Sequence, residues 1–557
     1  MVKICPHCEK VLHEGMEYCD GCGGVLNIDD EIQEYEISYL PMEYYKIKST
    51  VTKKDLLLQD NEYIKNPDYI DEEDKTIYFH KGSCESTLYK FVEDKSLTAS
   101  DMEKIAARII EIFKVLEEKE LIISAINLED FWIENEDINS IKLWVRRSFI
   151  VNKKIKNNFD YGYSVISPEI ENKGYDKIDL SSNVYLFGKL LLQIFLSDYE
   201  ILSDDEEMYF GYNLALFFPE LKYEFHNFIL KCCNTSKEKR FKSMEEVSAA
   251  FRYIIKKKSM EKDNLRLKAK GLSDVGVNKL KYALKKRNIS QCDDENQFNE
   301  DMFLIRRAED RHLLVLGDGV STATYGSGKE ASGILKKNIV DLWNERNKVI
   351  KEKQDVYDFI KEIIKRSNKD IVEAVKDKVN IEEDGVKGIM ASTLIVAIIL
   401  KNKMYYTSIG DSKIFIYSDK SKMNLLNYED NIMNENLKQK KSWRKIFNSK
   451  GCYAITRYIG GAKIVNGELQ PRNLDINLEE VMLQNNDIIM ICSDGVTDYI
   501  NPPYFSKGLW GITETLEEII EENKDKSLDD INKIIIDRAN KNGGGDNITV
   551  ITARVFK

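Results

Sequence analysis

Apolar residues follow two kinds of spacing along the chain, and each predicts one kind of element. In residues 101–119 they recur every three or four positions, which is typical of an amphipathic helix, and 183–196 and 244–255 repeat this spacing. Nearer the C-terminus, short segments rich in apolar residues predict buried strands. These segments are 312–316, 392–400, 403–409, 487–492 and 548–555. We therefore expect weak strand-like segments, then a helical region, and then a region in which strands alternate with two helical stretches.

These changes of pattern divide the chain into three predicted domains. A short segment rich in cysteine and glycine covers 1–28, and the helical region with its preceding strands covers 35–258. The residues around 256–270 are basic and polar, as is typical of a domain boundary. The strand-rich region then extends over 268–557. A chain of 557 residues has room for about three domains of ordinary size.

The charge balance excludes two classes of partner. The chain has 82 Lys and Arg against 94 Asp and Glu, which gives a net charge of −12. An acidic chain is a poor match for nucleic acid or for an anionic membrane surface. No apolar run is long enough to span a bilayer, and Cys5 precedes any apolar leader. We expect a soluble, cytoplasmic protein without a nucleic-acid or membrane partner; the sequence leaves its oligomeric state open.

Four cysteines near the N-terminus form two Cys-x-x-Cys pairs, Cys5 with Cys8 and Cys19 with Cys22. Two such turns can place four thiolates tetrahedrally around Zn²⁺. The segment resembles bacterial zinc ribbons. All four ligand positions are filled, so one zinc ion would be structural, and a unit this small needs the metal to fold. The other cysteines are scattered, as reduced core cysteines are.

The helical region carries several short motifs in a fixed order. These are the segments 88–97 and 116–123, then Ser167-Pro-Glu169, and finally Arg240 in a Lys-Glu-Lys-Arg-Phe motif. In this order they resemble the C-lobe of a eukaryotic-type protein kinase; an unrelated helical domain is the alternative. The resemblance implies an α+β, two-lobed domain in which Glu169 and Arg240 form a buried structural ion pair.

The residues that a kinase needs for chemistry are missing from this region. Phosphoryl transfer requires an Asp that accepts the hydroxyl proton and side chains that hold Mg²⁺. In the alignment with the kinase family, the catalytic Asp falls on Ala125 and the metal-binding Asp on Val145, and neither residue can replace it. Asp130 alone is a weak cation ligand. We therefore expect a pseudokinase without kinase activity, and the sequence leaves nucleotide binding open.

Acidic residues follow or precede the predicted strands of the C-terminal region. They occur in five motifs: Asn299-Glu300-Asp301, Asp318-Gly319, Gly410-Asp411-Ser412-Lys413, Ser493-Asp494-Gly495 and Gly545-Asp546-Asn547. Carboxylates, carbonyls and water are the ligands that Mg²⁺ and Mn²⁺ prefer. A glycine after a strand-terminal Asp leaves room for the ion. One Asp-Gly alone would indicate a turn, but the set predicts a metal site.

The order and spacing of these motifs resemble the metal-dependent protein phosphatases of type 2C over 268–557. Three further segments agree, namely Tyr325 to Ser332, Ala391 to Leu394 and Thr456 to Gly460. The resemblance implies an α/β/β/α sandwich. It also implies a hydrolase that removes phosphate from serine and threonine with water activated by two Mn²⁺ or Mg²⁺ ions.

The resemblance also implies a role for each acid. Asp318 would bridge both metal ions, with the carbonyl of Gly319 on one of them. Asp494 and Asp546 would bind the ion that orients the attacking water. Glu300 would serve the other ion.

The remaining positions of the resemblance have supporting or variable roles. Asp301 would lie behind the ligands, Asp411 matches the position of a third, looser metal ion, and Asn547 would orient Asp546. The family has a phosphate-binding Arg that this chain lacks. Counting back from the acids places Asn296 in that position, whereas counting forward from Gly276 places Lys279 there, so Lys279 is the candidate.

Two functions compete at this level. The first is an active phosphatase that acts on a phosphoprotein, such as a bacterial Ser/Thr kinase or its target, with the pseudokinase and zinc ribbon as targeting or regulatory modules. The second is a non-catalytic scaffold or phospho-reader that uses both enzyme-like domains for binding. The phosphatase-like site keeps every acid while the kinase-like site has lost its own. Because clustered carboxylates oppose folding unless a metal binds, this difference favours the active phosphatase.

Overall fold

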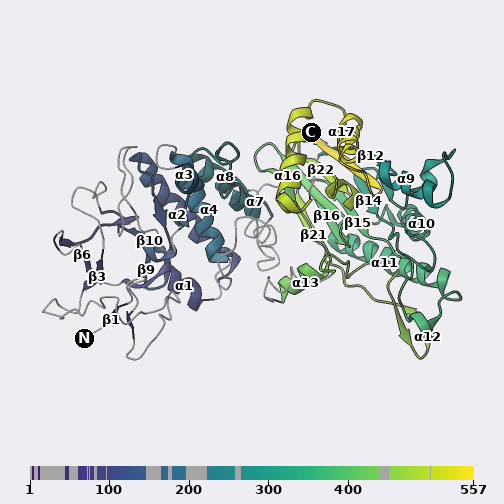
Figure 1. The fold of residues 1–557 in the computed structure, drawn as a ribbon, viewed down its shortest axis with the longest axis horizontal. Helices are drawn as coiled ribbons and strands as arrows, with labels where there is room; N and C mark the ends of the chain where they lie inside the picture. Colours follow the sequence, from purple (N-terminus) through teal and green to yellow (C-terminus); the bar gives the residue numbers. More distant parts are fainter. Residues whose placement is uncertain are drawn as a thin grey trace. The chain divides into compact units, whose positions relative to one another are not determined.

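The computed structural model (Figure 1) describes most of the chain, and its contacts divide it into two units. The first unit comprises Met1–Glu200 with Phe228–Arg252, and the second comprises Ile201–Asn227 with Tyr253–Lys557. The described residues are 3–4, 11–12, 44–48, 60–71, 73, 76–80, 84–95, 97–145, 165–173, 178–195, 223–256, 265–439, 451–501 and 504–556.

The first unit begins with a short antiparallel pair of strands, β1 (Lys3–Ile4) and β2 (Val11–Leu12), in which Lys3 lies opposite Leu12. The four cysteines of the predicted zinc ribbon lie outside the described residues. The zinc site therefore stays a prediction.

Two small sheets follow, and stacked aromatic rings fill the space between them. The ring of Trp144 lies 4.4 Å from that of Phe79 and 4.2 Å from that of Trp132. These rings form one buried cluster with Ile70 and Ile77. The strands are β3 (Tyr44–Lys48), β6 (Thr76–His80) and β5 (Tyr69–Asp71) in one sheet, and β4 (Ile64–Lys65), β10 (Asp137–Trp144), β9 (Phe131–Glu134) and β7 (Cys84–Thr87) in the other.

The helices of the first unit follow the apolar spacing of the sequence. The apolar side chains of α2 are buried, and the helix begins with a capping box in which the Thr98 hydroxyl and the Asp101 carboxylate each accept a backbone N–H. The predicted helices 101–119, 183–196 and 244–255 are confirmed. The described α-helices are α1 (Leu88–Asp94), α2 (Ala99–Glu118), α3 (Pro168–Lys173), α4 (Leu180–Phe195), α7 (Tyr223–Cys232) and α8 (Met244–Lys256).

The second unit contains two five-stranded antiparallel sheets. One has the order β12–β23–β22–β17–β18, with β12 (Arg266–Asp274), β23 (Ile548–Phe556), β22 (Ile488–Cys492), β17 (Lys413–Ser418) and β18 (Lys422–Leu425). The other has the order β13–β14–β15–β16–β21, with β13 (Met302–Ala308), β14 (Arg311–Gly317), β15 (Leu394–Leu400), β16 (Lys403–Ile409) and β21 (Glu479–Met482).

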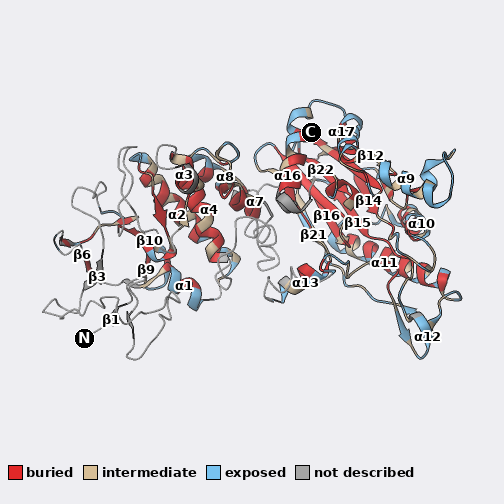
Figure 2. Cartoon of the chain, in the orientation of Figure 1, coloured by how far each residue is buried: buried red, intermediate tan, exposed pale blue. Residues whose placement is uncertain are grey.

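One hydrophobic cluster joins the inner faces of the two sheets. It includes Leu314 and Ile395 from one sheet and Ile491 and Ile551 from the other. Alternate residues of the β13–β14–β15–β16–β21 sheet, such as Val315, point to its opposite face and pack in a second cluster with helices α10 and α11. Figure 2 shows these strands buried along most of their length. The layers confirm the predicted α/β/β/α sandwich.

Helices cover both outer faces of the sandwich. Helices α10 (Gly328–Arg346) and α11 (Lys353–Val375) cover one sheet, and α16 (Tyr504–Asn523) and α17 (Leu528–Lys541) cover the other. The prediction of only two helical stretches in this region was wrong, because many of these helices are polar on their outward faces. A further helix, α9 (Val277–Lys286), follows β12. No helix of the described residues is long and apolar enough to cross a membrane.

Candidate active site

The strand register gathers the predicted acids at one end of the sandwich. Met302 lies opposite Gly317, so Asp301 and Asp318 adjoin the same end of the β13–β14 pair. In the other sheet Cys492 lies opposite both Val550 and Lys413. This pairing brings three more acids to an equivalent end: Asp411 before β17, Asp494 after β22 and Asp546 before β23.

Two glycines allow the backbone to approach closely around these acids. A Cβ atom on Gly319 would lie 2.3 Å from the carbonyl oxygen of Gly328 and 2.7 Å from that of Glu300. Gly276 has φ = +85° and would place a Cβ atom 2.1 Å from the carbonyl oxygen of Asp546. Any larger residue would push these loops apart. The glycine after Asp318 is thus needed for the local packing that positions Glu300.

Asp318 lies at the centre of the acidic group. Burial, together with the charges of Asp301, Asp494 and Asp411, raises the pKa of Asp318 well above its ordinary value. Its backbone is fixed by Thr393, whose hydroxyl accepts from the Asp318 N–H at 2.9 Å and whose own N–H donates to the Asp318 carbonyl at 2.7 Å. The carboxyl group is therefore held among like charges.

Asp301 is held behind Asp318 by two hydroxyl groups. Thr549 Oγ1 donates to Asp301 Oδ2 at 2.6 Å, and Ser493 Oγ donates to the same oxygen at 2.9 Å. Burial, followed by the charge of Asp494, raises the pKa of Asp301 to about 6. Burial also raises the pKa of Asp494, with the charge of Asp546 contributing.

Asp411 adjoins a buried ion pair. Lys413 Nζ lies 2.6 Å from Glu429 Oε1, with 3% and 11% of the two side chains exposed. Burial and the charge of Asp494 raise the pKa of Asp411 to about 8, although the Lys413 charge opposes this shift. The charge of Glu429, which also raises the pKa of Asp411, offsets that of Lys413.

Lys279 reaches the acids from α9. Its Nζ lies 2.5 Å from Asp546 Oδ1, 2.8 Å from Asn547 Oδ1, 3.1 Å from Ser321 Oγ and 3.4 Å from Glu300 Oε2. Burial alone would lower the pKa of Lys279, but the carboxylates of Asp546 and Glu300 outweigh it and raise the pKa. Lys279 therefore remains a cation at the edge of the acidic group.

The alternative position for the missing arginine, Asn296, lies in the short 3-10 helix η6 (Glu295–Phe298). Its carbonyl oxygen accepts from Lys329 Nζ at 2.7 Å. Of the two residues that the sequence suggested, the structure brings Lys279 and not the side chain of Asn296 into the polar network of the acids.

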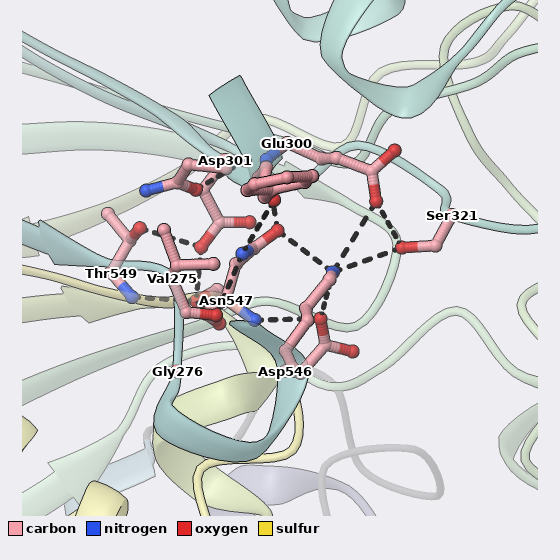
Figure 3. A network of polar contacts seen from close by, with 12 residues as sticks. Val275, Gly276, Glu300, Asp301, Ser321, Asp546, Asn547 and Thr549 are labelled. Atoms are coloured by element: carbon pink, nitrogen blue, oxygen red, sulfur yellow. Dashed lines mark hydrogen bonds and ion pairs between the residues drawn. The ribbon is translucent and has the colours of Figure 1, made fainter. Parts of the chain in front are cut away.

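Asn547 connects the polar network that Figure 3 shows. Its Nδ2 donates to the carbonyl oxygens of Val275 at 3.0 Å and Phe298 at 3.3 Å. Its Oδ1 accepts from the Glu300 N–H at 2.9 Å, and its own N–H donates to Asp546 Oδ1 at 2.7 Å. Asn547 therefore orients both Glu300 and Asp546.

The donor set fits hard divalent cations. One oxygen each of Asp301, Asp411 and Asp494 is buried and accepts no hydrogen bond, and such atoms need a proton or a cation nearby. Within the described residues, no three acidic, histidine or cysteine side chains converge as a complete ligand group. Carboxylate and carbonyl oxygens, which make up this set, are the ligands that Mg²⁺ and Mn²⁺ prefer.

In the first unit the structure brings together the predicted ion pair of Glu169 and Arg240. Arg240 Nη2 lies 2.6 Å from Glu169 Oε1 and Nη1 lies 3.2 Å from Oε2, with the side chains 0% and 5% exposed. Burial alone would raise the pKa of Glu169, but the hydrogen bonds and charge of Arg240 hold it below its ordinary value. Arg240 therefore favours the ionised form of the Glu169 carboxyl group.

The three positions that the sequence alignment places at kinase catalytic and metal-binding residues are buried. Ala125 is 5% exposed, Asp130 is 3% exposed and Val145 is 1% exposed. Asp130 Oδ2 accepts the backbone N–H of Asn127 at 2.9 Å and so caps a 3-10 turn. Two of the three positions therefore have no ionisable side chain, and the third has a local structural partner.

The sequence did not indicate several residues that position the acids. The hydroxyls of Ser493 and Thr549 hold Asp301, and Glu429 neutralises Lys413. The Ser321 hydroxyl donates to Glu300 Oε2. Ser493 adjoins Asp494 in sequence, but the other contacts depend on the sheet register and on loops far apart in the chain.

Comparison with known proteins gives a consistent result for this part of the chain. The family model "Protein phosphatase 2C" matches residues 290–531. The serine/threonine phosphatase stp of Listeria welshimeri is 23% identical over 257 residues, which is 46% of this chain and 88% of the relative. A putative protein phosphatase 2C-type protein of Streptococcus pyogenes is 27% identical over 242 residues, 43% of this chain and 83% of the relative. The solved serine/threonine phosphatase of S. agalactiae is 22% identical with a TM-score of 0.39, over 52% of this chain and 99% of that one.

Proposed function

We propose that this chain, whose C-terminal part is a serine/threonine phosphatase domain of the protein phosphatase 2C type, hydrolyses phosphoserine and phosphothreonine esters in proteins with two bound Mn²⁺ or Mg²⁺ ions. The observation that carries this proposal is the group of carboxyls at one end of the sandwich. The pKa of Asp318 is raised well above its ordinary value, and buried oxygens of Asp411 and Asp494 accept no hydrogen bond. A divalent cation would stabilise the ionised form of Asp318 and would bind the buried oxygens of Asp411 and Asp494.

The ligands of the two ions would be the acids that surround Asp318. Asp318 would be shared, Asp494 and Asp546 would hold one ion, and Glu300 would hold the other with the Gly319 carbonyl. Asp411 would take a third ion. When bound, such ions lower the pKa of a coordinated water and neutralise the oxygens of the phosphoryl group. Asp301 supports the ligands from behind through Ser493 and Thr549.

The chain's own residues would orient the substrate. The Lys279 ammonium group is held charged at the edge of the acids, where it can donate hydrogen bonds to a phosphate oxygen. Ser321 and Asn547 contact this ammonium group and fix its position. Lys279 would thus supply part of the charge that an arginine gives in the family; a guanidinium binds two oxygens at once, whereas an ammonium acts as a single charge.

The N-terminal parts would act as targeting or regulatory modules. Neither Ala125 nor Val145 can accept a proton or hold Mg²⁺, so the kinase-like region would bind partners without transferring phosphate. The four N-terminal cysteines would hold one structural Zn²⁺. The physiological substrate would be a phosphoprotein, such as a Ser/Thr kinase or its target.

A non-catalytic scaffold is the second candidate, and one feature opposes it. A reader of phosphorylated proteins needs cations at its site, yet here six carboxyl groups gather at one end of the sandwich, and Lys279 lies at their edge in ion pairs with two of them. Such a site repels a phosphate group unless divalent cations are bound. The charge of the site therefore favours a metal-dependent enzyme.

The test is hydrolysis of p-nitrophenyl phosphate by the purified full chain, with and without Mn²⁺. We expect release of nitrophenol that depends on Mn²⁺ and stops when EDTA is added. A phosphothreonine peptide should be hydrolysed under the same conditions. Absence of hydrolysis at every Mn²⁺ and Mg²⁺ concentration would support the scaffold instead.

A further inference from the structure

We propose that the exposed face of α9 is a docking surface for acidic residues close to the phosphorylated residue of a protein substrate. This proposal rests on the proposed function and adds a class of preferred substrate to it. The surface, named here the α9 face, consists of Lys281, Tyr282, Lys285 and Lys286.

The α9 face combines positive charge with an exposed aromatic ring. All four residues are exposed, and Tyr282 exposes 68% of its surface, the largest fraction among the exposed large hydrophobic residues of the described chain. Within the described residues, none of the three lysines is paired with a carboxylate. From residue 277 to 290 the sequence has five Lys and Arg and no Asp or Glu, in a chain with a net charge of −12. The α9 face is therefore positively charged, although the chain as a whole is negatively charged.

The helix is held firmly beside the acidic site. At its first turn, the N–H groups of Asn278 and Lys279 donate to the Gly544 carbonyl at 2.9 and 3.1 Å. At its end, the Arg287 guanidinium lies 4.5 Å from the centre of the Phe298 ring, two residues before Glu300. Both contacts join α9 to loops that carry the acids. The α9 face is therefore presented on a fixed element.

Residues on one side of α9 form a line from the acidic site to the end of the helix. Lys279 contacts Asp546, and Tyr282 and Lys286 follow it at i+3 and i+7, which is one side of a helix. With a rise of about 1.5 Å per residue, Lys286 lies about 10 Å along the axis from Lys279. About three residues of extended peptide span this distance. A peptide whose phosphate meets Lys279 can therefore place an acidic residue three positions away against Lys286.

Charge complementarity selects the occupant of this face. A phosphopeptide with nearby Asp or Glu residues is strongly anionic, and the carboxylates around Lys279 would repel such a peptide if it met only the site. Lys281, Lys285 and Lys286, which have no carboxylate partner in the described part of the chain, offset that repulsion.

The test compares two phosphothreonine peptides that differ only in their flanks, with Glu or Gln at the second to fourth positions on both sides. The variant K281Q/K285Q/K286Q removes the three charges, and Gln is tolerated in exposed helices about as well as Lys. The matched control is K361Q/K365Q/K369Q, which removes three exposed lysines from α11. Binding of both peptides is also measured by fluorescence polarisation, which does not depend on turnover.

We expect the wild type to prefer the Glu-flanked peptide and the α9 variant to lose about five- to tenfold in kcat/KM on it, since each exposed charge contact contributes a factor of about two. Its rates on the Gln-flanked peptide and on p-nitrophenyl phosphate should stay within about twofold, and the preference should decline with added salt. Equal rates of the wild type on both peptides, a preference that survives in the α9 variant, or an equal loss in the α11 control would overturn the docking surface. Absence of p-nitrophenyl phosphate hydrolysis in all proteins would instead contradict the proposed function, and polarisation would still decide whether the α9 face binds the acidic peptide.

Discussion

Replacing Asp318 by asparagine should make the metal-free C-terminal unit more stable, although the proposed metal site depends most on this residue. Burial and the neighbouring acids raise the pKa of Asp318 well above its ordinary value. Ionisation of this carboxyl group at neutral pH therefore opposes folding. Asparagine has nearly the same shape, does not ionise, and can donate a hydrogen bond to Asp301 or Asp494.

The neighbouring Asp301 sets the scale of the gain. Its pKa rises from 3.8 to about 6, and one pKa unit corresponds to about 1.4 kcal/mol. A carboxylate with the shift of Asp301 thus opposes folding by about 3 kcal/mol when it is fully ionised. We expect Asp318→Asn to increase the free energy of unfolding by about 1–3 kcal/mol at pH 8. In a unit of this size that gain raises Tm by about 2–10 °C.

The gain should depend on pH in one direction. A carboxyl group whose pKa is raised in the folded state binds its proton more tightly there than in the unfolded state. The wild type therefore loses stability as the pH rises above about 4, the ordinary value for Asp. The variant has no such group at position 318, so its advantage is small at pH 5 and largest at pH 8.

The assay is thermal unfolding of both proteins in EDTA at pH 5 and pH 8, followed by circular dichroism. The transition of the C-terminal unit is the one that added Mn²⁺ shifts upward in the wild type. Asp341→Asn, which changes an exposed residue of α10, is the control and should alter Tm at neither pH. An Asp318→Asn variant with unchanged or lower Tm at pH 8, or with the same gain at both values, would refute the reasoning.

Three further predictions concern the other predicted sites. Lys279→Met should lower kcat/KM for a phosphopeptide by about 10- to 100-fold, as expected for one lost charge-assisted hydrogen bond, whereas Lys279→Arg should retain most of the rate. Glu169→Gln should destabilise the kinase-like unit by about 3–5 kcal/mol in chemical denaturation, because the Arg240 charge would remain buried and unpaired, and phosphatase activity should persist. Cys19→Ser should lose about one zinc ion per chain by elemental analysis without loss of phosphatase activity; full zinc retention in that variant would contradict the predicted ribbon.

The sequence predicts the layers of the C-terminal unit because its strands are nearly continuous apolar runs. Segments such as 403–409 and 548–555 are buried on both faces, so their composition alone indicates interior strands. The five acidic motifs at strand ends could also be predicted, since Asp318 and Asp494 each follow such a run directly. The same reasoning could predict the amphipathic helix at 101–119.

Contacts that depend on tertiary register could not be predicted. The hydroxyls of Ser493 and Thr549 meet at Asp301 only because β22 pairs with β23 in one register. Helix α9 is short and none of its residues is fully buried, so its sequence carries little apolar signal. The sequence names Lys279 as a candidate beside Asn296, but its contacts with the acids depend on the hydrogen bonds that tie α9 to Gly544, which local sequence does not encode.

The most direct test of the account is the rate of phosphate release from a phosphothreonine peptide at saturating Mn²⁺, measured for the wild type and for Asp318→Asn. Because Asp318 would be shared by both ions, a single substitution should lower kcat by at least about a thousandfold, and EDTA should abolish the wild-type rate. Equal rates for the two proteins, or a wild-type rate that EDTA leaves unchanged, would contradict a two-metal mechanism centred on Asp318.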